Sequence, residues 1–314
     1  MKKLVREAGL PSVPAGDLPK IRFFDHDLQR HSSTLANRTV QLHANRTFPR
    51  SERFWMDWPI DTGDRPILLI HAHPDDEVFA GGAAVAWLSS LGAEVILRVA
   101  SGGEVAEGPG ANRLDARDQR SARLDQSCDL LGISYWNWLS NPGRWIDTGA
   151  QPDVHSLSMA TLEELCPSIL KAVNDINPRW LFTVGTDGLT GHPDHILIRR
   201  AIDVVMQQLG NRAPTVLGSK VRTSDIVAAH QLLGSRGIES AGSGRLVGTT
   251  EELDTCVAPF FAGQARQRAY EVYAGGDKKI EAIEDRRASI RPGDSLVLRS
   301  VFDVTGWNVD RFKC

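Results

Sequence analysis

Cysteine is scarce in this chain, and its spacing excludes two classes of protein. The four cysteines are far apart and form no CxxC pair. This argues against a disulfide framework and against a thiolate metal site, and it favours reduced thiols. The longest uncharged stretch, from Val78 to Ala93, is shorter than the roughly 20 apolar residues that span a bilayer. No apolar run of signal-peptide length precedes Pro11. We therefore expect a cytoplasmic protein that does not bind membranes.

An excess of positive charge is also lacking. Lys and Arg number 36 against 39 for Asp and Glu, a net charge of −3, so no nucleic-acid partner is expected. An apolar fraction of 41% is ordinary for a globular protein. Residues 1–63 are polar and Arg-rich but carry aromatic anchors such as Trp55. We predict that they form an N-terminal extension packed on a main domain of residues 64–314.

Apolar segments alternate along the main domain in a pattern that predicts an α/β fold. The runs at 67–70 and 180–184 are short and continuous, as in strands buried on both faces of a parallel sheet. Strands alternating with helices predict a doubly wound, mostly parallel sheet with helices on both faces. Further strands are expected at 94–99, 215–217 and 295–301, and helices at 78–91, 113–131, 157–173, 193–209 and 260–273.

Two short segments carry side chains that can coordinate a metal. His73 and Asp76 lie three residues apart directly after a predicted strand. His192 and His195 repeat that spacing before a predicted helix. Each residue alone has a structural alternative as a helix cap or a surface group. Three ligands from the two segments, with water in the fourth position, would make the open tetrahedral site of a catalytic zinc ion. Iron(II), cobalt(II), nickel(II) and manganese(II) are alternatives for this donor set.

The same segments resemble the signature motifs of a known family. His73-Pro74-Asp75-Asp76-Glu77 and Gly191-His192-Pro193-Asp194-His195 are similar to the motifs of the PIG-L, or LmbE-like, zinc-dependent N-deacetylases, and the likeness covers about residues 66 to 209. The resemblance implies a Rossmann-like fold. It implies that His73, Asp76 and His195 hold the metal and that Asp75 is the general base. It also implies that His192 stabilises the oxyanion and protonates the leaving amine, oriented by Asp194.

The resemblance further suggests substrate contacts. Glu104 follows a glycine as in many family members, and Arg120 matches an arginine in their next helix. Both residues have the alternative of being surface groups. Arg123 stands where the family has Glu, and Thr190 stands where some relatives have an aromatic residue, which puts those two contacts in doubt. A group of aromatic residues has two interpretations, sugar stacking or core packing: Tyr135, Trp136, Trp138 and Trp145.

Together these features predict a zinc-dependent hydrolase that removes the N-acetyl group from an N-acetylglucosamine-containing small molecule. The departures from the family pattern favour antibiotic or other natural-product biosynthesis over a glycosyl-inositol or GlcNAc-malate substrate. The sequence is also compatible with a two-metal phosphoesterase, a silent carbohydrate-binding module, and an amidase for a longer acyl chain. It leaves open whether the chain forms a homo-oligomer.

Overall fold

The computed structural model describes residues 54–55, 65–107, 112–149, 153–238, 246, 248–274 and 294–314. The predicted boundary at residues 63 and 64 lies outside these ranges, as does nearly all of the extension expected before it. From that extension the structure describes β1 (Phe54–Trp55), whose backbone pairs in parallel with β7 (Asp254–Val257). Among the helices of the described ranges, none has the length and apolar character needed to cross a membrane.

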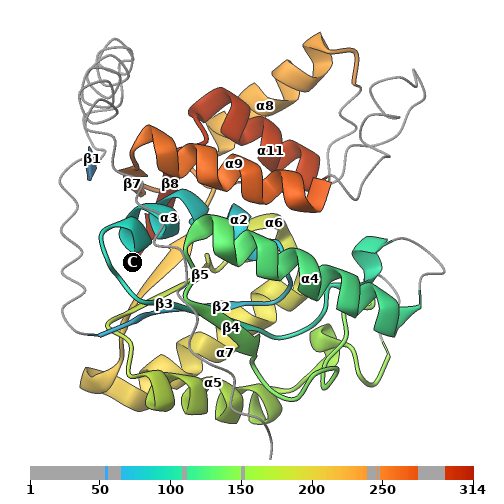
Figure 1. The fold of residues 1–314 in the computed structure, drawn as a ribbon, viewed down its shortest axis with the longest axis vertical. Coiled ribbons are helices and arrows are strands. Elements are labelled where there is room, and N and C mark those ends of the chain that lie inside the picture. Colours follow the sequence, from blue (N-terminus) through green and yellow to red (C-terminus); the bar gives the residue numbers. More distant parts are fainter. Residues whose placement is uncertain are drawn as a thin grey trace, which may run out of the picture. The chain divides into compact units, whose positions relative to one another are not determined.

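Within the described residues, eight strands form one sheet (Figure 1). Besides β1 and β7, they are β2 (Ile67–His71), β3 (Val95–Val99), β4 (Tyr135–Trp138), β5 (Trp180–Val184), β6 (Thr215–Ser219) and β8 (Val309–Lys313). Their order is β1-β7-β8-β6-β5-β2-β3-β4. In the run β6-β5-β2-β3-β4 all neighbouring strands are parallel, whereas β8 is antiparallel to both of its neighbours. The doubly wound, mostly parallel fold is therefore confirmed.

Helices cover both faces of the sheet. They are α2 (Asp76–Phe79), α3 (Gly82–Ser90), α4 (Arg113–Leu131), α5 (Leu162–Ile176), α6 (Gly188–Gly191), α7 (Pro193–Leu209), α8 (Thr223–Ser235), α9 (Phe260–Ala274) and α11 (Asp294–Thr305). Leu68 and Ile70 of β2 pack against α5 and α7, whereas Ile67 and Leu69 pack in the core that contains α3 and α4. Every residue of β2 is buried, as its continuous apolar run predicted.

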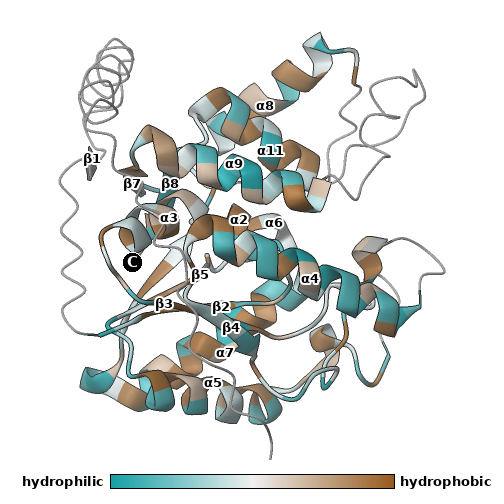
Figure 2. Ribbon diagram, viewed as in Figure 1, coloured by the Kyte–Doolittle hydropathy of each residue, from teal (hydrophilic) through white to brown (hydrophobic). Residues whose placement is uncertain are grey.

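The helices agree with the sequence pattern except where local chemistry interrupts them. The predicted helix at 78–91 is divided into α2 and α3, because Gly81 between them has a φ of 101°. The predicted helix at 157–173 is a short 3₁₀ turn followed by α5, which begins after the capping box of Thr161. In Figure 2, α4 is mostly hydrophilic, and it buries only a narrow stripe of side chains against the core.

The C-terminal third differs most from the sequence-based expectation. The predicted strand at 295–301 is wrong, because this segment belongs to α11. Its apolar residues are buried at the spacing of a helix: Val297, Leu298, Val301 and Phe302. Four further elements were not predicted from the sequence: α8, β4, β7 and β8.

The sheet topology determines where the two motifs lie. From β2 the sheet continues to β3 and β4 on one side, and β5 and β6 lie on the other side. A crevice forms at the carboxyl ends of two neighbouring parallel strands when the sheet continues to opposite sides from them in this way. The first motif follows β2 directly, and the second follows β5, its immediate neighbour. The fold therefore brings together two segments that are more than one hundred residues apart in the chain.

Candidate metal and catalytic site

The first motif folds tightly around the end of β2. Asp76 begins α2, and its Oδ2 accepts hydrogen bonds from the backbone N–H groups of Ala72 (3.1 Å) and His73 (3.0 Å). These bonds hold the carboxylate over the end of the strand. Asp75, just before the helix, has a φ of 105°, in the left-handed region that residues other than glycine rarely adopt. The two adjacent carboxylates therefore have different environments.

The second motif follows β5 and the short helix α6. His192 is the residue before α7, and Pro193 is the first residue of that helix, where its missing N–H is tolerated. The Nδ1 of His195 lies 2.9 Å from the backbone oxygen of Gly188. This oxygen can only accept a hydrogen bond, so Nδ1 carries a proton. The neutral ring of His195 therefore has its lone pair on Nε2, as a metal ligand requires.

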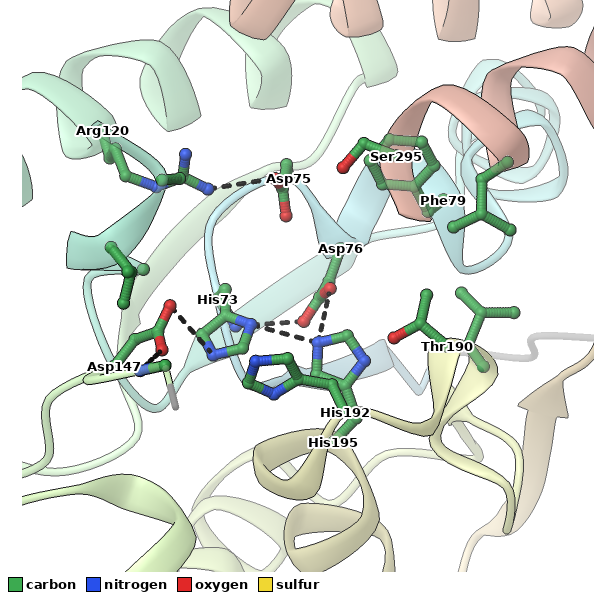
Figure 3. Close-up of a pocket in the computed structure, with 16 residues that line it drawn as sticks. His73, Asp75, Asp76, Phe79, Arg120, Asp147, Thr190, His192, His195 and Ser295 are labelled. Atoms are coloured by element: carbon green, nitrogen blue, oxygen red, sulfur yellow. Dashed lines mark hydrogen bonds and ion pairs between the residues drawn. The ribbon is translucent and has the colours of Figure 1, made fainter. Parts of the chain in front are cut away.

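The two motifs meet in one cluster (Figure 3). The Nε2 of His195 lies 3.0 Å from Nδ1 of His73 and 3.1 Å from Oδ1 of Asp76. The ring of His192 is close as well, with its centroid 5.0 Å from that of His73. Ring nitrogens of His73, His192 and His195 lie within 4.8 Å of one another. His73, Asp76 and His195, the three residues expected to hold a metal, are in mutual contact.

Carboxylates around the cluster stabilise positive charge within it. Burial lowers the pKa of His73, but the hydrogen bond with Asp194 and nearby carboxylates, including Asp147, outweigh burial and raise it to about 10. Burial raises the pKa of Asp76, but His195 and His73 overcome this and hold it well below its usual range. Groups that favour a cation here would also favour a divalent ion. Two imidazoles and one carboxylate form a donor set that fits zinc or another divalent transition metal.

Asp194 contacts a different histidine from the one expected. Its Oδ2 lies 3.0 Å from Nε2 of His73, and both side chains are buried. The ring of His192 instead accepts the backbone N–H of Asp194 at Nδ1, over 3.3 Å. Burial, together with the charges of His73 and His195, lowers the pKa of His192 to about 4. The Asp194 carboxylate therefore orients His73, and His192 is a neutral ring with its proton on Nε2.

Arg120 fixes the carboxylate of Asp75. Its Nη2 donates to Oδ2 of Asp75 over 3.0 Å and also to the backbone oxygen of Pro74. Arg120 comes from the hydrophilic helix α4, yet it is only 4% exposed. Burial raises the pKa of Asp75, and the charge of Arg120 opposes that rise. Arg120 therefore lies in the site, and Asp75 is its partner there.

Asp147 is a site residue that the sequence analysis missed. Its Oδ2 lies 3.9 Å from Nε2 of His73, and its Oδ1 accepts the backbone N–H of Gly149. The backbone N–H of Asp147 donates to Oε2 of Glu104 over 2.9 Å. Glu104, expected to contact substrate, is 6% exposed and bonds this loop. The turn formed by Asp147 and Gly149 is a local sequence signal of a loop, but nothing in its distance from the two motifs marks it as part of the site.

The site residues line a cavity of about 420 Å³. His73, Asp75, Asp76, Arg120, Asp147, His192 and His195 form its polar part, and the apolar part includes Phe79, Val105, Ala106, Leu189 and Leu298. Leu298 and Ser295 belong to α11, so the C-terminal third contributes to the cavity (Figure 3). Of the aromatic group considered for sugar stacking, Trp145 is buried in the core on one face of the sheet, and Trp136 and Trp138 pack against the core on the other face.

Comparison with known proteins shows one family match. Residues 68–206 match the model of PIG-L, described as GlcNAc-PI de-N-acetylase. This range contains nearly all of the polar residues described above, from both motifs and from the loop of Asp147.

Curated relatives named 1D-myo-inositol 2-acetamido-2-deoxy-alpha-D-glucopyranoside deacetylase are similar to part of the chain. The one from Thermobispora bispora is 33% identical over 150 residues, which are 44% of this chain and 50% of the relative. The one from Acidothermus cellulolyticus is 28% identical over 240 residues, which are 72% of this chain and 80% of the relative. The chain spans about half the length of the first of these relatives.

Two solved structures are similar in fold. The A40926 pseudoaglycone deacetylase has a TM-score of 0.53 at 15% identity, over 80% of this chain and 96% of that one. The zinc-inhibited form of teicoplanin deacetylase has a TM-score of 0.52 at 15% identity, over 79% of this chain and 98% of that one. At this identity the likeness concerns the fold.

Proposed function

We propose that this chain, whose residues 68–206 match the PIG-L family model, is a metal-dependent deacetylase of an N-acetylglucosaminyl compound. One observation carries the proposal: Nε2 of His195 lies 3.0 Å from Nδ1 of His73 and 3.1 Å from Oδ1 of Asp76. Asp75 lines the same cavity as a further carboxylate. The reaction would release acetate and a free amino sugar.

His73, Asp76 and His195 would hold the metal ion. A bound divalent ion lowers the pKa of water to roughly 7 and polarises a carbonyl group. Asp194 accepts the Nε2–H of His73 and so keeps Nδ1 of that ring turned toward the ion site. The backbone oxygen of Gly188 has the same effect on His195. Zinc is our first choice, because imidazole and carboxylate ligands without thiolate suit it, and a different divalent transition metal is the second choice.

Amide hydrolysis requires removal of a proton from the attacking water and delivery of a proton to the leaving nitrogen. Asp75, held by Arg120, accepts the first proton and can return it to the nitrogen, so the step balances. His192 presents Nε2–H, because its Nδ1 accepts a backbone N–H. It donates a hydrogen bond to the oxygen on which negative charge develops. This division of roles differs from the family resemblance, which assigns proton delivery to His192.

The substrate we favour is an N-acetylglucosaminyl inositol. The curated relatives carry that substrate in their names, and this supports the glycosyl-inositol alternative over a natural-product pathway. A cavity of about 420 Å³ lies in the usual range for small-molecule sites. The carboxylate of Asp147 at its wall can accept a hydrogen bond from a sugar hydroxyl.

An assay of amine release tests the proposed function. Protein loaded with one equivalent of zinc should release free amine and acetate from GlcNAc-inositol faster than from GlcNAc-malate or an N-acylated glycopeptide pseudoaglycone. Removing the ion with a chelator should stop the reaction, and adding zinc back should restore it. Phosphate release from a phosphate ester, with two ions bound per chain and no amine release, would instead support the phosphoesterase alternative. Sugar binding without any turnover would support a binding module.

Replacement of Asp194 tests its contact with His73. We expect Asp194→Asn to weaken zinc binding by about 10- to 100-fold, because the carboxylate that orients the ligand ring is lost. Calorimetric titration of the metal-free protein with zinc measures the affinity. Asp203→Asn is the matched control, since Asp203 lies on the same helix and its partly exposed carboxylate pairs with Arg199 rather than with a site residue. Equal affinities for the two variants would show that Asp194 does not support the ligand.

A further inference from the structure

Asp75 has a strained backbone at the position where the proposed reaction needs a base. Its φ of 105° is unfavourable for a residue with a Cβ, so the surrounding contacts must maintain it. Its carboxylate is held by Arg120. Its backbone is held separately, because the N–H of Asp75 donates to Oε2 of Glu77 over 2.9 Å. Arg120 and Glu77 therefore fix this residue at its side chain and at its main-chain N–H, while its main-chain oxygen accepts the N–H of Val78 over 2.9 Å.

Glu77 is fully buried and is itself held from two helices. Its Oε1 accepts the hydroxyl of Ser127 on α4 (2.5 Å) and the hydroxyl of Tyr273 on α9 (2.7 Å). With the N–H of Asp75 on Oε2, three donors point at this carboxylate. A carboxylate that only accepts hydrogen bonds satisfies all three. A solvated surface acid would not have this environment, so Glu77 serves a local structural need.

Tyr273 connects the two groups that hold Asp75. Its hydroxyl donates to Glu77, and the guanidinium of Arg120 lies over its ring, 5.7 Å from the centroid. α9 thus contacts both Glu77, which holds the main chain of Asp75, and Arg120, which holds its side chain. Tyr273 lies almost two hundred residues further along the chain than Glu77. This explains why a motif of five consecutive residues includes a third acidic residue that does not line the cavity.

We propose that Glu77 is a positioning residue that keeps Asp75 in the left-handed conformation and so aims the Asp75 carboxylate into the cavity. The catalytic consequence rests on the proposed function, whereas the geometric consequence does not. Without Glu77, the N–H of Asp75 loses its partner and the φ of Asp75 can relax to a negative value. The carboxylate then moves away from Arg120 and from the cavity.

Crystal structures of Glu77→Ala and Glu77→Gln test the geometry without any assay. In the Ala variant we expect a negative φ at Asp75 and an Arg120 to Asp75 separation well above 3.0 Å. In the Gln variant we expect the native conformation, because the amide oxygen can accept the Asp75 N–H while its NH₂ group donates to the two hydroxyls. A φ near 105° in the Ala variant would overturn the proposal. If Glu77→Ala does not fold, Tyr273→Phe replaces it. We then expect faster hydrogen exchange at the Asp75 amide. An unchanged exchange rate would contradict the proposal.

Kinetics test the link to Asp75. We expect Glu77→Ala to lower kcat by about 10- to 100-fold with KM and metal content unchanged, since a misplaced group costs rate rather than binding. Glu77→Gln should recover most of the loss. In an Asp75→Asn background, Glu77→Ala should cause no further fall in kcat, because the two residues act as one unit. Equal losses in both backgrounds would overturn the positioning role. A wild-type protein inactive on every acetamido sugar would overturn the proposed function alone, because the crystallographic result still decides the role of Glu77.

Discussion

Asp75→Asn should lower kcat by a factor of about 10² to 10⁴ while the protein keeps its metal. Asn has the same shape and can still accept a hydrogen bond from Arg120, but it cannot take a proton from water. The proposed ligand Asp76 is untouched, and its Oδ2 keeps the backbone bonds from Ala72 and His73. The measurement is the rate of amine release under saturating substrate, together with the zinc content of the same sample.

Two comparisons make the Asp75 result specific. Asp118→Asn removes an exposed carboxylate from the same helix that carries Arg120, and it should leave kcat unchanged. A crystal structure of Asp75→Asn should retain the contact with Arg120. A retained contact would show that kcat falls because the base is lost and not because the loop has changed conformation. If Asp75→Asn has the wild-type rate, another group removes the proton. Asp147 would then be the first to examine, because it is a further carboxylate in the cavity lining.

The residues of the two motifs could be predicted because their geometry is local. His73 and Asp76 are placed together by one turn after β2, and His192 and His195 by the first turn of α7. One topological rule then puts the two strand ends side by side. Which carboxylate faces which histidine could not be read in this way. Asp194 is two residues from His192, yet its side chain reaches His73 of the other motif.

Arg120 was expected in the site from the family resemblance, but other side chains that reach the site from distant segments could not be predicted. Asp147 lies in a loop after β4, and Leu298 lies on a helix whose sequence suggested a strand. The amphipathic pattern of a segment indicates which face is buried but not which partner it meets. The same limit applies to β8, in which three of the five residues are charged. Asp310 of that strand is 3% exposed, because it pairs with an arginine that is also buried.

That arginine, Arg266, makes a strong prediction for stability. It is 0% exposed, and its Nη1 lies 3.1 Å from Oδ1 of Asp310. Its other donors bind the backbone oxygens of Val78 (2.8 Å) and Phe79 (3.1 Å), at the end of the helix that begins with Asp76. We expect Arg266→Met to lower the free energy of unfolding by about 3 to 5 kcal/mol, because Asp310 is left as an unpaired buried charge. Urea denaturation measures this change.

The size of that loss distinguishes a buried pair from a surface pair. Lys171→Met removes the same charge from an exposed pair with Asp175, and it should change the free energy of unfolding by less than about 1 kcal/mol. Arg266→Met combined with Asp310→Asn should be more stable than Arg266→Met alone, since no unpaired charge remains. An Arg266→Met variant as stable as Lys171→Met would mean that water or a shifted side chain satisfies Asp310. The measured difference therefore tells whether the C-terminal elements hold the first motif through this ion pair or only through apolar packing.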